Sequence, residues 1–236
     1  MNLLAESDMI AMSFVQYDEF LNANPVVSPS NRDAKMVLDV GRKIAESVHV
    51  FLKEKHMMDR VAGFEWEFNL IDDDQVNAWC MPGGKVVVYT GILPLTKTKN
   101  GLAVVMGHEI AHAIARHGNE RMSQQILIQY GGQALSTLSE SQPEEMQNLF
   151  LTSYGIAGGL GSLAFSRSQE VEADKLGLIF MAMAGYDPRE AIDFWQRMSN
   201  AGGSNPPELL STHPSDDTRI SELTAFMPEA MNYYKP

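Results

Sequence analysis

The chain has 236 residues, 44% of them hydrophobic, which is enough for a sizeable buried core, and we expect a single domain covering residues 1–236. Its formal net charge of −12 argues against a protein that binds nucleic acid or an anionic membrane surface. The single cysteine, Cys80, excludes an internal disulfide and a zinc site built from cysteines.

The sequence contains no run of about 18 apolar residues, the length that a membrane-spanning helix needs. Its first residues, MNLLAESDMIAMSF, lack the basic stretch and apolar core of a signal peptide. We therefore expect either a cytosolic protein or one from which a leader has been removed.

The first part of the chain predicts two helices and a small sheet. Apolar side chains recur at helical spacing over residues 7–21, within an N-terminal helical extension at 1–30, and again over residues 36–52. Residues 64–70 alternate strictly between apolar and polar, as in a strand with one buried face. The segments 76–81 and 85–89 flank Pro82-Gly83-Gly84, which indicates a hairpin. A small antiparallel sheet is therefore expected.

The next predicted helix carries the motif His108-Glu109-x-x-His112. Positions four apart lie one above the other on a helix, so the two histidines can bind one ion through their ring nitrogens. Zinc accepts imidazole ligands, and a catalytic zinc keeps three protein ligands and one position for water. Glu109 lies beside them and can act as the base for that water.

This helix, predicted over residues 102–115, is apolar nearly all round and is therefore expected to be buried. Asn100 is its expected N-cap, and Gly118 is expected to end it. Buried glutamate and histidine are costly unless they are coordinated or hydrogen-bonded, which favours a functional site. A five-residue pattern also arises by chance, with the histidines as ordinary core residues, so a third ligand is needed.

The rest of the chain predicts further helices, at residues 119–138, from 141, at 170–184, at 187–199 and from 215 onwards. The glycines within residues 155–161 indicate either close helix packing or a flexible lid, and the sequence does not distinguish the two.

Candidates for the third ligand follow the motif. His117, five residues after His112, lies about 140° further round the helix, so we expect it to point away and to complement the helix dipole. Residues 166–174 concentrate acidic side chains, and Glu170 and Asp174 share one helix face. One of them can bind metal while the other orients a metal-bound imidazole. Alternatively, they form an acidic first turn that stabilises the helix through its dipole.

Three stretches in this order resemble the M48 family of zinc metallopeptidases. They are His-Glu-x-x-His-x-x-x-Arg-His at 108–117, Ser-Arg-x-x-Glu-x-Glu-Ala-Asp at 166–174 and Ser-Thr-His-Pro-x-x-x-x-Arg-Ile at 211–220. The resemblance covers residues 37–220 and implies a mostly helical α+β fold of the zincin-like (gluzincin) type, with a small antiparallel sheet beside the metal-binding helix.

The resemblance also implies roles for individual residues. It implies one Zn²⁺ per chain bound by His108, His112 and Glu170, with Asp174 orienting a ligand, and with Asn77, Ala78 and Trp79 on the edge strand along which substrate binds. His213 and Arg219 match a late histidine and arginine that approach the metal site. His213 can stabilise the oxyanion of a tetrahedral intermediate, or bind the open zinc position and hold the enzyme latent. Without the resemblance, it is an ordinary loop residue.

The implied function is a zinc-dependent endopeptidase that cleaves unfolded or misassembled proteins, with Glu109 as the base. Because predicted spans are lacking, the soluble, periplasmic lipoprotein-like branch fits best. We therefore expect a periplasmic or outer-membrane-associated protein, with a possible lipid anchor outside this sequence and a cytoplasmic location as the alternative. Expected partners are protein or peptide substrates. The rival interpretations are a latent or chaperone-like zinc protein that binds clients or assembly partners, and a helical protein without metal.

Overall fold

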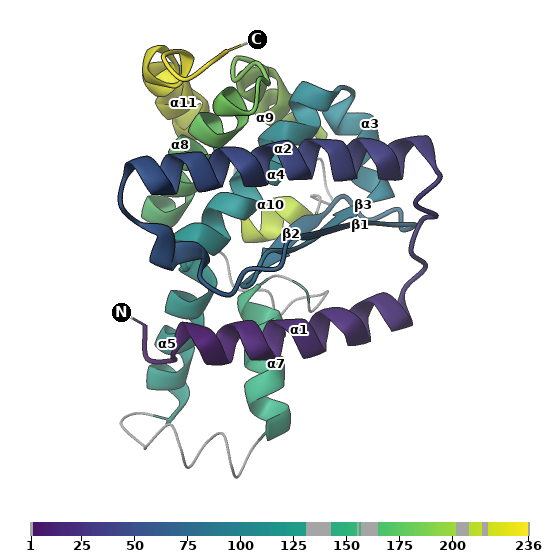
Figure 1. Cartoon of the computed structure of the whole chain (residues 1–236), viewed down its shortest axis with the longest axis vertical. Helices are drawn as coiled ribbons and strands as arrows, with labels where there is room; N and C mark the ends of the chain where they lie inside the picture. Colours follow the sequence, from purple (N-terminus) through teal and green to yellow (C-terminus); the bar gives the residue numbers. More distant parts are fainter. Residues whose placement is uncertain are drawn as a thin grey trace.

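The computed structural model describes residues 2–130, 143–154, 156, 165–201, 208–213 and 217–235. The expected fold class is confirmed, since a mostly helical chain surrounds one small sheet (Figure 1). In chain order the elements are α1 (Glu6–Ala23), α2 (Arg32–Glu54), η1 (Met58–Val61), β1 (Glu67–Ile71), β2 (Ala78–Met81), β3 (Lys85–Tyr89), η2 (Thr90–Ile92), α3 (Leu93–Thr96), α4 (Lys99–Ala115), α5 (His117–Tyr130), α7 (Pro143–Ser153), α8 (Arg167–Met183), α9 (Glu190–Ala201), α10 (Glu208–Thr212) and α11 (Asp217–Met231).

Two expectations fall largely outside the described residues. They concern the glycine-rich segment 155–161, of which only residue 156 is described, and the end of the helix expected over 119–138. Among the described residues, no helix combines the length and the apolar character that crossing a membrane requires.

The sheet is mixed, with the strand order β1-β3-β2. β2 and β3 form the expected antiparallel hairpin, in which Trp79 lies opposite Val87. β1, however, pairs with β3 in parallel, with Glu67 opposite Lys85, so the expectation of an antiparallel sheet is wrong for this strand. The physical reason is that alternating polarity specifies which face of a strand is buried, but neither its neighbour nor its direction.

The two edges of the sheet differ in what covers them. Along β1, Val26 forms a bridge to Ile71 and the Val27 amide donates to the carbonyl of Leu70, so chain residues occupy part of this edge. β2 forms the other edge, and it lies close to α4. An edge strand exposes backbone groups that can pair with another extended chain.

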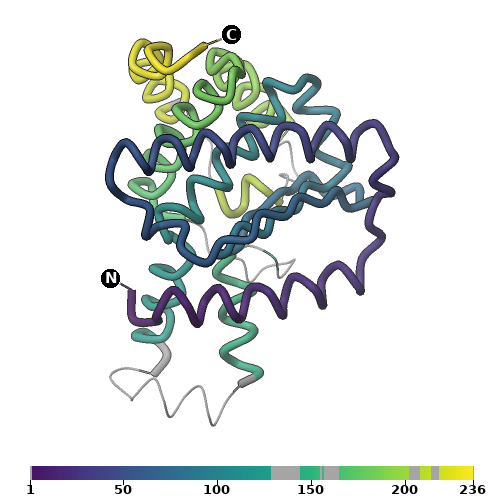
Figure 2. Tube along the Cα trace, in the orientation of Figure 1, coloured from purple at the N-terminus to yellow at the C-terminus, as the bar shows by residue number. Residues whose placement is uncertain are grey.

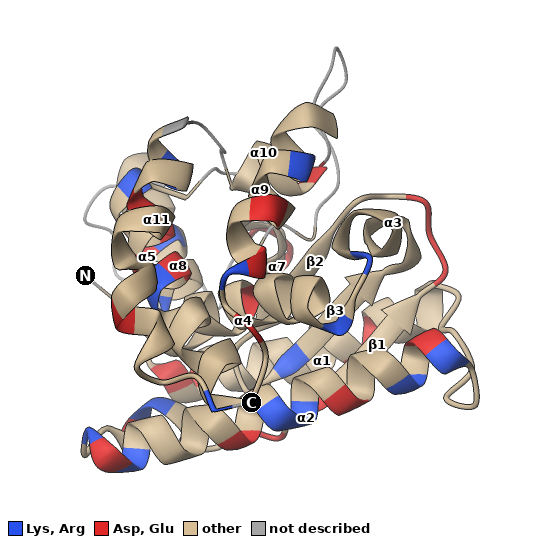
Figure 3. Cartoon of the chain, turned by 90° about the horizontal axis from the view of Figure 1, so that it is seen from above, with Lys and Arg blue, Asp and Glu red and all other residues tan. Residues whose placement is uncertain are grey.

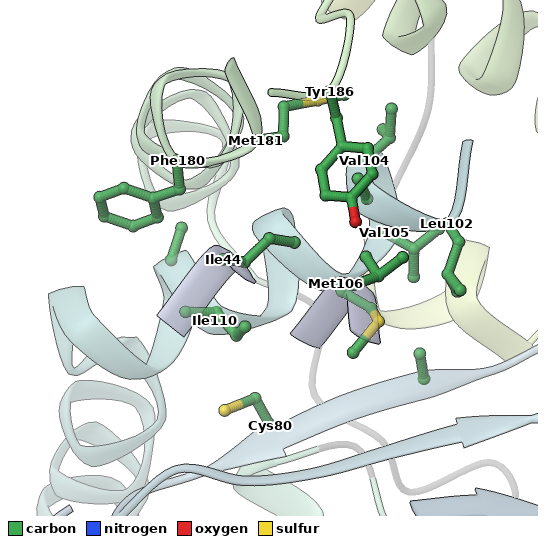
Figure 4. Close-up of a cluster of buried hydrophobic side chains, with 14 of the residues drawn as sticks. Ile44, Cys80, Leu102, Val104, Val105, Met106, Ile110, Phe180, Met181 and Tyr186 are labelled. Atoms are coloured by element: carbon green, nitrogen blue, oxygen red, sulfur yellow. The ribbon is translucent and has the colours of Figure 1, made fainter. Parts of the chain in front are cut away.

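Helices cover both faces of the sheet, with α2 and α4 on one face and α1 on the other (Figures 1 and 2). The central strand β3 serves both sides: Val86 and Val88 belong to the core that contains α2, α4 and α8, whereas Val87 belongs to a second core with α1 and α7. Figure 4 shows part of the first core, with Ile44 from α2, Ile110 from α4 and Phe180 from α8 among its buried side chains. The outer face of α2 carries its charged residues, as the amphipathic pattern predicts (Figure 3).

Helix α4 begins and ends at residues other than those expected. Thr98 is the N-cap and its hydroxyl accepts from the Gly101 amide at 3.1 Å, whereas Asn100 accepts from the amide of Asp187. The helix ends at Arg116, which adopts the left-handed conformation with φ 65°, and α5 begins at the next residue. Gly118 therefore does not end α4.

Side-chain contacts explain why α4 ends at Arg116 and not at Gly118. A Cβ at residue 118 would lie 2.2 Å from the ring of Tyr154, so Gly118 provides room for α7 rather than a helix stop. The left-handed conformation of Arg116 is costly for a residue with a side chain. Its guanidinium contacts Glu6, with Nε 3.4 Å from the carboxylate, and donates to the carbonyl of Asp59 at 3.3 Å. These contacts help to hold the corner between α4 and α5.

Helices α4 and α8 approach each other closely in the core. Gly107 and Gly177 face each other there, and a Cβ built on either would lie 2.9 Å from a backbone atom of the other helix. Two glycines thus allow α8 to lie directly against the helix that carries the histidine motif.

A methyl group at this contact should separate the two helices. We expect Gly177→Ala to lower the free energy of unfolding by about 1–3 kcal/mol, because backbone atoms cannot move aside as a flexible side chain can. Urea denaturation measures this change. Ala11→Ser, at an exposed position of α1, is the control and should change stability by less than about 0.5 kcal/mol. Equal stability of Gly177→Ala and wild type would contradict the close packing.

Candidate metal centre

Four buried side chains from three parts of the chain converge on one point. Helix α4 provides His108 and His112, the first turn of α8 provides Glu170, and His213 follows directly after α10. One potential ligand atom from each of these residues lies within 4.8 Å of every other. The structure thus brings the predicted ligands together, and it adds His213 to them.

Local structure positions the acidic ligand and the late histidine. Ser166 caps α8 in a capping box with Gln169, which fixes the turn from which Glu170 projects. The amide of Phe165 donates to the carbonyl of Thr212 at 3.0 Å, which ties the start of α8 to the end of α10. Glu170 and His213 therefore meet because their two helix ends are joined.

The distances between the ligand atoms fit a small coordinated cation. The Nε2 atom of His108 lies 3.0 Å from Nε2 of His112 and 3.1 Å from Nδ1 of His213. The carboxylate oxygens of Glu170 lie 3.3 Å from Nε2 of His112 and 3.5 Å from Nε2 of His108. Ligands placed 2.0–2.1 Å from a tetrahedral ion are about 3.3 Å from one another.

Unpaired polar atoms also point to a cation. Oε1 of Glu109 is buried without a hydrogen-bond partner, as is Oε2 of Glu170, although the latter lies 2.9 Å from Nη1 of Arg219 as an ion pair. Buried oxygens without such partners are costly, and a coordinated ion or a water removes that cost. The donor set of imidazoles and one carboxylate therefore fits a divalent metal ion.

Arg219 and Asp174 are buried side chains that contact the potential metal ligands. Oδ1 of Asp174 lies 2.9 Å from Nδ1 of His108 and 2.6 Å from Nη2 of Arg219. The guanidinium carbon of Arg219 stacks 3.4 Å from the ring centroid of Trp195. Asp174 thereby fixes a proton on Nδ1 of His108 and leaves Nε2 free to coordinate.

Burial and neighbouring charges set the protonation states. Burial raises the pKa of Glu109, as suits a general base and acid, and burial lowers the pKa of His112 well below its usual value, so that its ring is neutral. Burial also opposes the ionised form of Glu170, but His213 and His108 outweigh it and hold the pKa of Glu170 far below normal. Burial also opposes the ionised form of Asp174, but Arg219 and His108 together outweigh it and lower the pKa of Asp174. Both carboxylates are therefore ionised.

Comparison with known proteins gives a family for this arrangement. Residues 40–227 match the model of peptidase family M48. The chain belongs to this family. It is 37% identical over 183 residues to the mitochondrial metalloendopeptidase OMA1 of Schizosaccharomyces pombe, covering 76% of this chain and 52% of that protein.

Two further relatives are more distant. The chain is 33% identical over 180 residues to the mitochondrial metalloendopeptidase OMA1 of Homo sapiens, covering 72% of this chain and 34% of that protein. It is 32% identical over 165 residues to the beta-barrel assembly-enhancing protease of Yersinia pestis, covering 66% of this chain and 33% of that protein. The chain thus spans about half the length of these relatives or less.

In this M48 chain, the three residues of the expected substrate-binding segment lie at the start of the edge strand β2 and differ in their contacts. Asn77 precedes β2, and its side-chain oxygen accepts from the amide of Ala78 at 2.9 Å. The ring of Trp79 instead packs on α1, edge-on to Phe20 with the ring centroids 5.0 Å apart. Trp79 therefore lies on the edge strand, but its side chain belongs to the core on the other face.

The expectation that His117 points away from the site is wrong. Because Arg116 is left-handed, His117 begins a new helix and turns back, which places its Nδ1 atom 2.9 Å from Nδ1 of His112. Its Nε2 atom lies 3.3 Å from a carboxylate oxygen of Glu172, and burial lowers its pKa. Helical spacing failed here because α4 had already ended.

Two aromatic residues beside the site were not singled out from the sequence. Phe165 lies against the rings of His112 and His213, with centroids 3.9 and 4.8 Å away, and Trp195 supports Arg219. Neither carries a local signal, because an aromatic residue before or within a helix usually indicates core packing. The one local indication that Phe165 lies near the site is its position directly before Ser166, the N-cap of α8.

Replacing His112 should change how the stability of the metal-free protein depends on pH. Because burial holds the pKa of His112 well below its usual 6.5, the unfolded chain binds a proton here at a pH where the folded chain does not. The neutral ring therefore contributes stability above about pH 6.5, which is lost as the pH falls, by up to about 1.4 kcal/mol per pH unit. Urea unfolding of the wild type should lose stability between about pH 7.5 and 5.5 more steeply than that of His112→Asn.

The control for removing an imidazole is His49→Gln, at an exposed position of α2, and it should keep the slope of the wild type. Parallel slopes for His112→Asn and wild type would show that this ring is not neutral and buried in the folded protein.

Proposed function

We propose that this chain is a zinc-dependent endopeptidase in which Glu109 activates water. The observation that carries the proposal is the convergence of two imidazoles from α4 and one carboxylate from α8, with Glu109 next to His108 on the same helix. Membership of family M48 supports the same assignment. Residues 1–236 act as one peptidase domain in this proposal, with residues 1–30 as its N-terminal extension.

Zinc is the metal of this proposal. Imidazole nitrogen together with one carboxylate oxygen is a donor set that zinc accepts in catalytic sites with an open position. In this proposal the ion is held by His108, His112 and Glu170, and Asp174 orients His108. A bound zinc ion supplies Lewis acidity, which makes water more acidic and polarises the carbonyl of the substrate.

The chain itself supplies the proton transfers. Glu109 accepts a proton from the attacking water and passes it to the leaving amine, a double task that suits a carboxylate whose pKa is raised by burial. Arg219 holds Glu170 and Asp174 in place through its two ion pairs. It acts on the metal ligands and not on the substrate.

The edge of β2 is the proposed binding place for an extended substrate. Val87 lies opposite Trp79, and the amide of Tyr89 donates to the carbonyl of Asn77 at 3.1 Å, so alternate residues of β2 bond to β3. The backbone groups of Ala78 and Cys80 then face the open edge. Pairing through the main chain recognises extended segments with little sequence preference, which fits unfolded or misassembled proteins.

The relatives' names bear on substrate and compartment. One is called a beta-barrel assembly-enhancing protease, and others are called mitochondrial metalloendopeptidases. These names support protein substrates for this chain, but they do not support the expected periplasmic location. The compartment stays a prediction, as does a lipid anchor.

His213 holds the site in a latent conformation in this proposal. Its Nδ1 atom lies 2.8 Å from Oε1 of Glu170 and 3.1 Å from Nε2 of His108, where a fourth ligand belongs, and its Nε2 atom lies 3.5 Å from Oε1 of Glu109. At a bound metal ion the same ring would take the place of water, and it also lies close to Glu109, the proposed base. This geometry favours latency over the other role expected for His213, stabilisation of the oxyanion.

Glu109→Gln should abolish peptide hydrolysis and keep about one zinc ion per chain, because the amide cannot accept the proton and Glu109 is not a ligand. Cleavage of an unfolded casein-like substrate and metal analysis measure the two properties. Retained turnover would refute Glu109 as the base. If the chain instead worked as a chaperone-like binder, Glu109→Gln would replace the wild type fully in cells.

His213→Asn should raise turnover of the same substrate several-fold, because a shorter side chain frees the fourth position and the carboxylate of Glu109. His49→Gln is the matched control and should leave turnover unchanged. A loss of turnover in His213→Asn with zinc retained would instead assign His213 to oxyanion stabilisation.

A further inference from the structure

The ring of His112 has a partner on each side. Its Nε2 atom faces the ligand cluster, 3.3 Å from Oε1 of Glu170, and its Nδ1 atom lies 2.9 Å from Nδ1 of His117. The other nitrogen of His117, Nε2, lies 3.3 Å from a carboxylate oxygen of Glu172. Three side chains thus form a continuous line from the surface to the candidate metal centre.

The protons in this line follow from the chemistry of imidazole. To coordinate through Nε2, a neutral His112 must carry its proton on Nδ1. That N–H then donates to Nδ1 of His117, which must be the unprotonated nitrogen of its ring. His117 in turn carries its proton on Nε2 and donates it to Glu172. In this arrangement the lone pair of His112 is on Nε2, the nitrogen that faces the ligand cluster.

We infer that His117 is a positioning residue that fixes the tautomer and the ring orientation of His112 through a hydrogen-bond chain ending at Glu172. The inference rests on the proposed function, since the oriented ring serves the metal ion. Metal-binding histidines generally donate their second N–H to an acceptor, and removing that acceptor typically weakens metal binding by about 10–100-fold.

Helix α8 supports both imidazoles in this way. Asp174 accepts directly from His108, and Glu172 acts on His112 through His117. The two supports differ in exposure, because Asp174 is buried whereas the side chain of Glu172 is 59% exposed. A buried imidazole therefore bridges the distance between a surface carboxylate and the second metal-binding ring.

Two variants of equal size test the acceptor role. In His117→Asn, the side-chain oxygen can take the place of Nδ1 and accept from His112, whereas His117→Leu offers no acceptor and leaves a buried N–H unpaired. We expect the zinc dissociation constant, measured by competition with a chelator, to rise about 10–100-fold for His117→Leu and to stay within about 3-fold of wild type for His117→Asn.

A second measurement reports on the tautomers directly. In zinc-loaded protein, long-range ¹H–¹⁵N correlation spectra should show the proton on Nδ1 of His112 and on Nε2 of His117. Urea unfolding of the metal-free variants shows that each variant is folded under the conditions of the zinc titration.

Several results would overturn the inference. Equal zinc affinity of His117→Leu and wild type would remove the role of the acceptor, and equal weakening in both variants would assign His117 to packing. The opposite tautomers would exclude the chain of donors. If the wild type itself failed to bind zinc, the proposed function would fall and this inference with it, which distinguishes the two failures.

Discussion

The contact between α4 and α8 is the constraint on which the site depends. Gly107 and Gly177 let the two backbones approach closely, so acidic side chains on α8 reach the imidazoles of α4. Three carboxylates of α8 then act on the same pair of rings. Glu170 approaches both Nε2 atoms, whereas Asp174 directly and Glu172 indirectly act on the Nδ1 side of the rings. A wider separation of the helices would remove all of these contacts together.

The close packing places several ionisable groups where water is excluded, and such groups persist only if each has a partner. Arg219 is the partner of two of these groups, because it pairs with Glu170 and Asp174 while its flat face stacks on Trp195. Such a buried network stabilises a fold poorly compared with apolar packing. Its presence beside the buried helix α4 is therefore better explained by chemistry than by stability.

The conformation of the site also depends on how two helix ends are joined. The hydrogen bond between Phe165 and Thr212 links the start of α8 to the end of α10, and Phe165 lies against the ring of His213. Glu170, a proposed ligand, and His213, which takes the fourth position in the proposed latent state, are thus held by the same small region. In the proposed latent state, opening requires His213 to move relative to α8, whereas the three other proposed ligands can stay where α4 and α8 place them.

The sequence by itself determined the local parts of this protein: the helix that carries His108 and His112 and the shared face of Glu170 and Asp174 follow from spacing along one helix. The convergence of α4, α8 and α10 was expected only because three motifs in order resemble a known family. The tertiary structure alone decided the parallel direction of β1 and the return of His117 to the site. The reason is physical: periodicity describes one element at a time, whereas strand direction and a left-handed corner depend on distant neighbours.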